Sequence, residues 1–182
     1  MKKILLIFGS LIPFLYLTYE IMVLQNINDP IKYIYTFTGV SAIVFILASI
    51  IISLVKNFVN FMKHRKIIGL FGFFYAFLHF LNFVILDAEI SLEFIINETV
   101  KKPFIYLGMF SFLIILLMAI SSTKNLYKQY NKYHKLVYIS IISLFIHTIM
   151  AQKSLVLIDW IFIVLVLIIG ILKVYQYKLF FR

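Results

Sequence analysis

"HRKIIGLFGFFYAFLHF", residues 64–80, sets a basic cluster directly before an apolar stretch, and a histidine, His79, lies well inside that stretch. No Asp, Glu, Lys or Arg stands between Lys66 and Asp87. A helix that spans a membrane needs ~20 mostly apolar residues, so this stretch predicts a span that begins at the basic cluster. An ionisable side chain inside the hydrocarbon is costly and points to a functional site.

The rest of the chain has the same character. Of its 182 residues, 64% are hydrophobic, and the mean hydropathy is +1.06; a soluble domain is ~45–50% apolar. We expect an all-α integral membrane bundle of six transmembrane helices, forming one domain over residues 1–182. The apolar runs predict spans near 4–24, 38–56, 67–87, 103–121, 135–151 and 155–175, with no internal repeat. The absence of cysteine excludes disulfides, thiolate metal sites and cysteine nucleophiles.

The charges indicate the orientation. The basic start and apolar middle of the N-terminus resemble a signal peptide, but there is no small-x-small cleavage site, so we interpret it as a retained first span. With the N-terminus inside, the inner segments carry 13 basic and no acidic residues, whereas the outer segments carry 4 basic and 7 acidic ones. Basic residues favour the cytoplasmic side, so both termini are predicted to be cytoplasmic. The basic loops are expected to contact anionic lipid and not nucleic acid.

The segment 88–103 is too polar to span the membrane. Ile90, Phe94 and Val100 predict a short interfacial helix whose apolar side chains face the membrane. Pro103 suits the first turn of the next span.

On the face of the third span that carries His79, the other side chains are small. Gly69, Gly72, Ala76 and His79 follow one another at intervals of three or four residues, so they share one face of a helix. Small residues let helices approach closely, and beside a histidine they predict a groove in which a flat macrocycle lies against the backbone.

The fifth span repeats this arrangement. Ser140, Ser143, His147 and Ala151 share one face, and Ser143 is expected to accept a hydrogen bond from the His147 ring. The alternative for either histidine is a hydrogen bond to a neighbouring helix without a ligand role.

The two histidines are predicted to lie at a common depth. His79 lies eight residues before Asp87, and His147 lies six residues before Lys153. At ~1.5 Å per residue, both lie ~9–12 Å below the outer boundary. Two histidines at one depth fit the two axial ligands of a haem b in a bundle interior.

His134 and His64 do not belong to this pair of predicted haem ligands. His134 precedes His147 by 13 residues, ~20 Å along a helix, which suits a second, stacked haem. However, the two side chains then point ~140° apart, so an altered helix start is needed. The alternative is a solvated interfacial histidine, as expected for His64 in the basic loop.

Three stretches carry a resemblance to a known family: "HRKIIGLFGFFYAFLHFLNFVILD", "KKPFIYLGMFSFLIILLMAISSTKNL" and "YNKYHKLVYISIISLFIHTIM". Together with "DPIKYIYTFTG", residues 29–39, they resemble the MsrQ (YedZ) family. Its members are the haem-binding membrane subunits of the periplasmic methionine sulfoxide reductase system, within the ferric reductase-like transmembrane superfamily.

The resemblance implies a multi-pass protein of the bacterial inner membrane. It passes electrons from the quinone pool or a flavin donor to a periplasmic, molybdopterin-containing subunit that reduces methionine sulfoxide. The histidines of the family match His79, His134 and His147, which implies haem b. FMN is implied by the resemblance alone, because no phosphate-cradling loop is present.

The sequence departs from the family at several places. In two-haem relatives a histidine stands 14 residues before the one that matches His79, whereas this chain has Arg65. Arg65 is then expected to pair with a haem propionate or a flavin phosphate. Other departures are Thr36, Val40, Lys66, Tyr130 and Thr148.

Two other functions remain open. One is a stand-alone transmembrane cytochrome b that reduces ferric iron or another external acceptor. The other is a transporter or structural protein, which acidic residues deep within the spans would support; Asp87 and Asp159 instead lie near the outer ends of their spans. No Gly-rich nucleotide loop is present, so we expect an electron-transfer subunit that neither oxidises NAD(P)H nor reduces methionine sulfoxide by itself.

Overall fold

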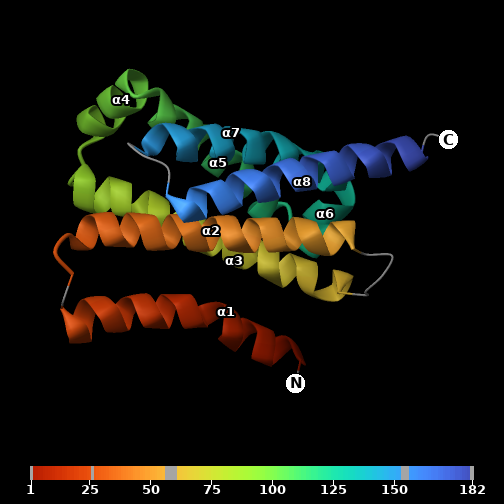
Figure 1. Cartoon of the computed structure of the whole chain (residues 1–182), viewed down its shortest axis with the longest axis horizontal. Helices are drawn as coiled ribbons and strands as arrows, with labels where there is room; N and C mark the ends of the chain where they lie inside the picture. Colours follow the sequence, from red (N-terminus) through yellow and green to blue (C-terminus); the bar gives the residue numbers. More distant parts are fainter. Residues whose placement is uncertain (1, 26, 56–60, 153–155, 181–182) are drawn as a thin grey trace. The chain divides into compact units, whose positions relative to one another are not determined.

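The computed structural model describes residues 2–25, 27–55, 61–152 and 156–180. Within these ranges all regular structure is helical (Figure 1). The chain divides into two compact units, Met1–Ile95 and Ile96–Arg182, and each is described by itself below.

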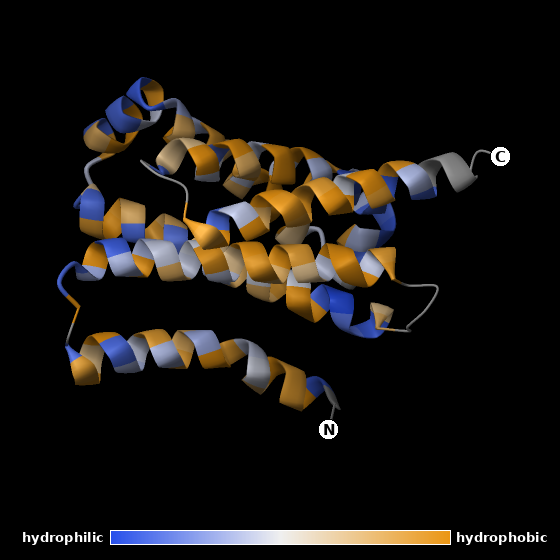
Figure 2. Ribbon diagram, viewed as in Figure 1, coloured by the Kyte–Doolittle hydropathy of each residue, from blue (hydrophilic) through white to orange (hydrophobic). Residues whose placement is uncertain are grey.

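Six helical segments in the described part of the chain are long and apolar enough to span a membrane, as the sequence predicts. Figure 2 shows their mainly hydrophobic course and the hydrophilic residues at the start of the third segment. The segments are Lys3–Leu24, Pro30–Leu54, Met62–Asp87, Pro103–Ile120, Asn125–Ala151 and Leu157–Gln176. The predicted ends at 56 and 155 fall outside the described residues, as do Lys56, Lys153 and Arg182.

The helix that contains the second predicted span begins eight residues before the predicted start of that span. Helix α2 (Pro30–Leu54) begins at Pro30, and the Asp29 carboxylate accepts a hydrogen bond from the backbone N–H of Lys32 at 3.0 Å. Asp before a helix and Pro in its first turn are both strong start signals. The apolar run alone missed them because Lys32 and three tyrosine or threonine residues dilute the first turns.

The first unit is built around the close packing of α2 on α3 (Met62–Leu81). A Cβ atom on Gly72 would lie 2.8 Å from Ile46 Cγ1 and 3.1 Å from the Ile46 backbone nitrogen. Gly69 faces Ser49 in the same way, at 3.6 Å. The small-residue face of α3 is therefore filled by α2, so the predicted groove for a macrocycle is wrong at these glycines.

Both long helices at the edges of this unit end in π-helical turns. Helix α1 (Lys2–Tyr19) continues as η1 (Glu20–Leu24), and α3 continues as η2 (Asn82–Asp87). A π-turn inside a longer helix is rare and often marks a functional position. The second of these begins three residues after His79.

Tyr75 fastens α1 to the pair formed by α2 and α3. Its side chain is fully buried, and its ring stacks on Phe45 with centroids 5.3 Å apart. The hydroxyl donates to the Ser10 carbonyl at 2.7 Å and accepts from the Phe14 N–H at 3.1 Å. Pro13 already removes one backbone donor from this turn of α1, so the phenol bridges the helix where its own ladder is weakest.

We expect Tyr75→Phe to lower the free energy of unfolding by about 1 kcal/mol, because two hydrogen bonds to backbone groups are lost. Reversible unfolding in mixed micelles measures the change. Tyr106→Phe is the matched control, since Tyr106 is exposed. Equal stability of the two variants would contradict the bridging role of the hydroxyl.

The second unit is built around α5 (Pro103–Ile120) and α7 (Val137–Ala151). The hydroxyls of Ser111 and Ser140 lie 2.7 Å apart, and both residues are buried. Along the chain, α5 is followed by α6 (Lys124–Tyr130) and the 3-10 helix η3 (Asn131–Leu136), and α7 is followed by α8 (Leu157–Phe180).

The polar segment at 88–103 forms a short helix, α4 (Leu92–Lys101). Phe94 and Val100 are exposed on it, as expected of an amphipathic helix, whereas Ile90 precedes the helix with a positive φ of 63°. Pro103 stands in the first turn of α5, as predicted. The contact of this helix with a membrane stays a prediction.

Candidate functional site

His79 lies in the last turn of α3 and is held by α2. Its Nδ1 atom is 3.1 Å from the backbone carbonyl oxygen of Tyr35. A carbonyl only accepts hydrogen bonds, so Nδ1 carries the proton, and the lone pair of the neutral ring is on Nε2. The Thr38 hydroxyl lies 3.4 Å from the same nitrogen, and the Tyr35 ring meets the imidazole edge to face at 5.3 Å.

His147 is held in the same way in the second unit. Its Nδ1 atom is 2.6 Å from the backbone carbonyl oxygen of Phe104 on α5. This ring therefore also carries its proton on Nδ1 and its lone pair on Nε2. The Phe104 ring lies beside the imidazole, with centroids 6.1 Å apart.

A glycine makes room for each imidazole. A Cβ atom on Gly39 would lie 3.2 Å from the His79 ring, and one on Gly108 would lie 2.9 Å from the His147 ring. In each unit the glycine follows the residue with the accepting carbonyl by four positions, one helical turn. We call Tyr35 with Gly39, and Phe104 with Gly108, the carbonyl–glycine pairs.

These pairs were not predicted, although the sequence contains a signal for them. Both read as an aromatic residue, three others and a glycine: "YTFTG" at 35–39 and "FIYLG" at 104–108. The glycines precede His79 and His147 by 40 and 39 residues. A search for a local repeat around the histidines, instead of a repeat of whole segments, finds this correspondence.

The predicted role of Ser143 is wrong. Its hydroxyl donates to the Leu107 carbonyl at 2.8 Å, one turn along α5 from Phe104. The acceptor for the His147 ring is the Phe104 backbone, which no reading of side chains reveals. The face of α7 that carries Ser140, Ser143 and His147 is thus joined to α5 at three successive turns.

His134 lies in η3, so the helix start is altered, as the second-haem hypothesis requires. Its Nε2 atom is 3.1 Å from the Ser121 hydroxyl, and the Tyr127 ring meets its ring at 5.1 Å. This contact is made through Nε2, whereas the backbone carbonyl contacts of His79 and His147 are made through Nδ1.

Arg65 and His64 lie in the first turn of α3, and both are half-buried. Arg65 is 14 residues before His79, ~21 Å along the helix. It therefore belongs to the opposite end of the span from His79.

Each carbonyl–glycine pair gives its histidine a hydrogen bond of the kind that metal-ligating histidines usually make. A ligating imidazole almost always donates its other N–H to a carbonyl or carboxylate, which fixes the tautomer and raises the basicity of the ligating nitrogen. Both rings meet this condition before any metal binds. His79 and His147 belong to different units, so their joint ligation of one iron stays a prediction.

Comparison with known proteins identifies a family and relatives whose sequences this chain matches. Residues 38–146 match the family described as "Ferric reductase like transmembrane component". This match includes His79 and His134 and ends one residue before His147.

Two relatives bear the name "Protein-methionine-sulfoxide reductase heme-binding subunit MsrQ". The one from Brucella anthropi is 31% identical over 132 residues, which cover 69% of this chain and 60% of the relative. The one from Brucella ovis is 29% identical over 132 residues, with the same coverage. The chain thus spans 60% of the length of these relatives.

Proposed function

Because the chain belongs to the ferric reductase-like transmembrane family, we propose that it is a haem b-binding subunit that carries electrons across the inner membrane of a bacterium. Its donor is the quinone pool or a flavoprotein. Its acceptor is a periplasmic, molybdopterin-containing subunit that reduces methionine sulfoxide in oxidised proteins. The names of the Brucella relatives support the haem and the reductase partner.

The observation that carries the proposal is the pair of histidines with preset tautomers. His79 and His147 each donate Nδ1–H to a backbone carbonyl of the neighbouring helix, so each would hold a haem through Nε2. Bound haem supplies one-electron redox chemistry, and the protein supplies its position and tunes its potential. The residues present therefore fit this group.

The carbonyl acceptors also favour rapid electron transfer. A ring that is held by a hydrogen bond and packed against a glycine has little freedom to move when the charge of the iron changes. A backbone carbonyl inside a helix is itself fixed by that helix. We infer that the chain keeps both ligand rings nearly still throughout turnover.

One haem fits the chain better than two. The Nε2 atom of His134 contacts Ser121. In addition, Arg65 stands where two-haem relatives have the histidine that would bind the second haem together with His134. Arg65 is proposed to pair with an anionic group, a propionate or a flavin phosphate, at the inner end of the bundle. FMN is implied as a second cofactor by the family resemblance alone.

The role is tested by electron delivery. Purified protein is reduced with dithionite under anaerobic conditions and mixed with the periplasmic methionine sulfoxide reductase subunit of the same organism. We expect the reduced spectrum to return fully to the oxidised one when the partner subunit and an excess of methionine sulfoxide are both present. The His79→Ala variant, which lacks a ligand, is the control and transfers no electrons.

The same preparation separates the second candidate function. A stand-alone ferric reductase is reoxidised by a ferric chelate with no partner protein. Reoxidation by the chelate at the rate seen with the partner, together with no response to methionine sulfoxide, would contradict the reductase-subunit role and favour this alternative.

A further inference from the structure

The part of the His79 helix beyond Leu81 is held to α2 by hydrogen bonds of side chains other than His79. After Leu81 the α-helix widens into the π-helix η2, whose hydrogen bonds span five residues instead of four. In an uninterrupted α-helix, Asp87 would point about 80° away from His79. Each π-helical residue turns the chain by a smaller angle, which reduces this difference.

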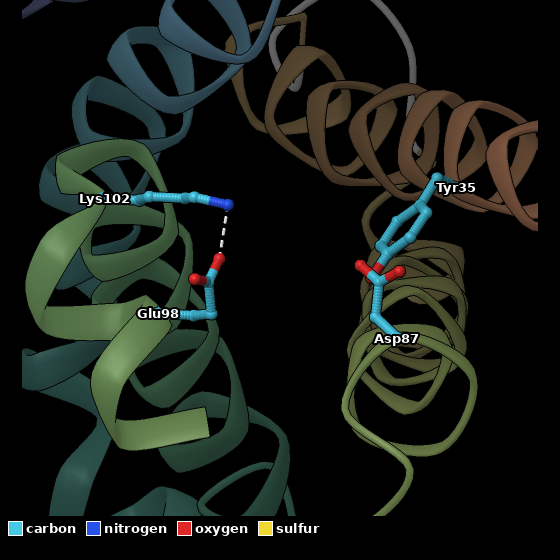
Figure 3. Close-up of polar contacts among 4 residues, drawn as sticks. All are labelled: Tyr35, Asp87, Glu98 and Lys102. Atoms are coloured by element: carbon cyan, nitrogen blue, oxygen red, sulfur yellow. Dashed lines mark hydrogen bonds and ion pairs between the residues drawn. The ribbon is translucent and has the colours of Figure 1, made fainter. Parts of the chain in front are cut away.

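Because of this change, the side chain of Tyr35 on α2 contacts both His79 and Asp87. The Tyr35 ring packs against the imidazole of His79 at 5.3 Å, and its hydroxyl donates to Asp87 Oδ2 at 2.8 Å. Figure 3 shows the phenol of Tyr35 extending from its helix to the Asp87 carboxylate at the end of η2. Tyr35 also provides the carbonyl that accepts from His79.

A second contact ties the start of η2 to the same helix. The buried Asn82 side chain donates through Nδ2 to the Ile31 carbonyl at 3.2 Å. This carbonyl belongs to the first turn of α2, one turn before Tyr35. The π-helix is therefore fastened to α2 at both of its ends, and His79 lies one turn before the nearer contact.

We propose that Tyr35 and Asp87 are positioning residues that hold η2 against α2 and thereby fix the plane of the His79 imidazole. The proposal rests on the proposed function where it concerns the haem. The Tyr35 phenol acts through its ring on the imidazole and through its hydroxyl on Asp87. Asp87 acts as the hydrogen-bond acceptor that keeps the ring in place, and its charge is not required.

The expected effect follows from the hydrogen bond between His79 and the Tyr35 carbonyl. Donation from Nδ1–H makes the imidazole a stronger base and stabilises the oxidised iron. When the Tyr35 ring is free to move, the imidazole plane shifts and this hydrogen bond weakens. Loss of the Tyr35–Asp87 contact therefore raises the midpoint potential of the haem without removing it.

The test compares five single variants of the full chain, and the double variant of Tyr35→Phe with Asp87→Ala, in lipid nanodiscs. Tyr35→Phe and Asp87→Ala remove the contact, whereas Asp87→Asn keeps an oxygen that accepts from the phenol but removes the charge. Glu98→Gln removes the carboxylate of the half-buried Glu98, which pairs with the exposed Lys102 and is also drawn in Figure 3. Tyr19→Phe removes the hydroxyl of an exposed tyrosine.

Three readouts are measured on each variant: the haem midpoint potential, the electron paramagnetic resonance g values, and the hydrogen exchange of residues 82–91. Exchange does not depend on haem. It reports the backbone bonds of this segment, such as those from Ala88 N–H to the Phe83 carbonyl and from Ile90 N–H to the Val84 carbonyl.

We expect Tyr35→Phe and Asp87→Ala to raise the potential, to shift the largest g value, and to speed exchange several-fold. Their double variant changes no more than either single one, because both remove one interaction. Asp87→Asn, Glu98→Gln and Tyr19→Phe match the unsubstituted protein in all three measurements.

Two results overturn the proposal. The first is a Tyr35→Phe protein with unchanged potential, g values and exchange. The second is an Asp87→Asn protein that shifts as far as Asp87→Ala, which would assign the effect to charge. A colourless unsubstituted protein would refute the haem role instead, and the exchange rates would still decide whether Tyr35 and Asp87 hold η2.

Discussion

His79→Ala and His147→Ala each abolish the low-spin haem b spectrum of the purified protein. The unsubstituted protein is expected to show a sharp Soret band and narrow α-bands on reduction, since two imidazoles produce a low-spin iron. With one imidazole lost, the iron becomes high-spin or the haem dissociates. The absorption spectrum and the haem-to-protein ratio measure both outcomes.

Added imidazole is expected to restore much of the low-spin spectrum in both variants, because it replaces the missing ligand without the covalent link. His64→Ala is the control and keeps the full spectrum, since His64 lies in the first turn of α3, far along the helix from His79. Low-spin haem retained in both alanine variants would contradict the ligand assignment.

His134→Ala examines the number of haems. We expect the haem-to-protein ratio to stay at one, because the ring nitrogen that would bind iron contacts Ser121. A ratio that falls from two to one in this variant would assign His134 a haem of its own.

Gly108→Ala removes most of the bound haem, and Gly39→Ala removes less. A Cβ atom at position 108 would lie 2.9 Å from two atoms of the His147 ring. The ring cannot withdraw without lengthening its 2.6 Å hydrogen bond to Phe104. Overpacking of this kind costs about 1–3 kcal/mol, and about 1.4 kcal/mol is tenfold in affinity. At position 39 the corresponding distance is 3.2 Å, so the ring gives way more easily.

Haem titration of the apoprotein measures both affinities. Gly9→Ala and Gly170→Ala are matched controls, since a Cβ atom at either position meets no atom within 4 Å. An affinity of the Gly108→Ala protein equal to that of these controls would contradict the role of Gly108 beside the imidazole.

The six spans were predictable from the sequence because they depend on residue type. Long apolar runs give membrane helices whatever their neighbours are. His79 and His147 stand out because imidazole is rare in such runs. The start of α2 was equally readable from Asp29 and Pro30, but hydropathy gave those signals no weight.

What the sequence could not supply was the partner of each side chain. Gly72 and His79 share a face of α3, and that face was read as a groove, whereas Ile46 of α2 fills it at Gly72. Ser143 was assigned to His147 because it is the nearest polar side chain on α7. The true acceptors are backbone carbonyls, which every residue has, so only the packing of α2 on α3 and of α5 on α7 selects Tyr35 and Phe104.

The two carbonyl–glycine pairs also bear on biogenesis. Each imidazole finds its acceptor on a helix of its own half of the chain, 43 or 44 residues upstream. As the polypeptide leaves the translocon, each half can therefore orient its ring once its own hairpin has entered the lipid. If the two histidines are the proposed haem ligands, the orientation of each ring would thus be set within its own half of the chain.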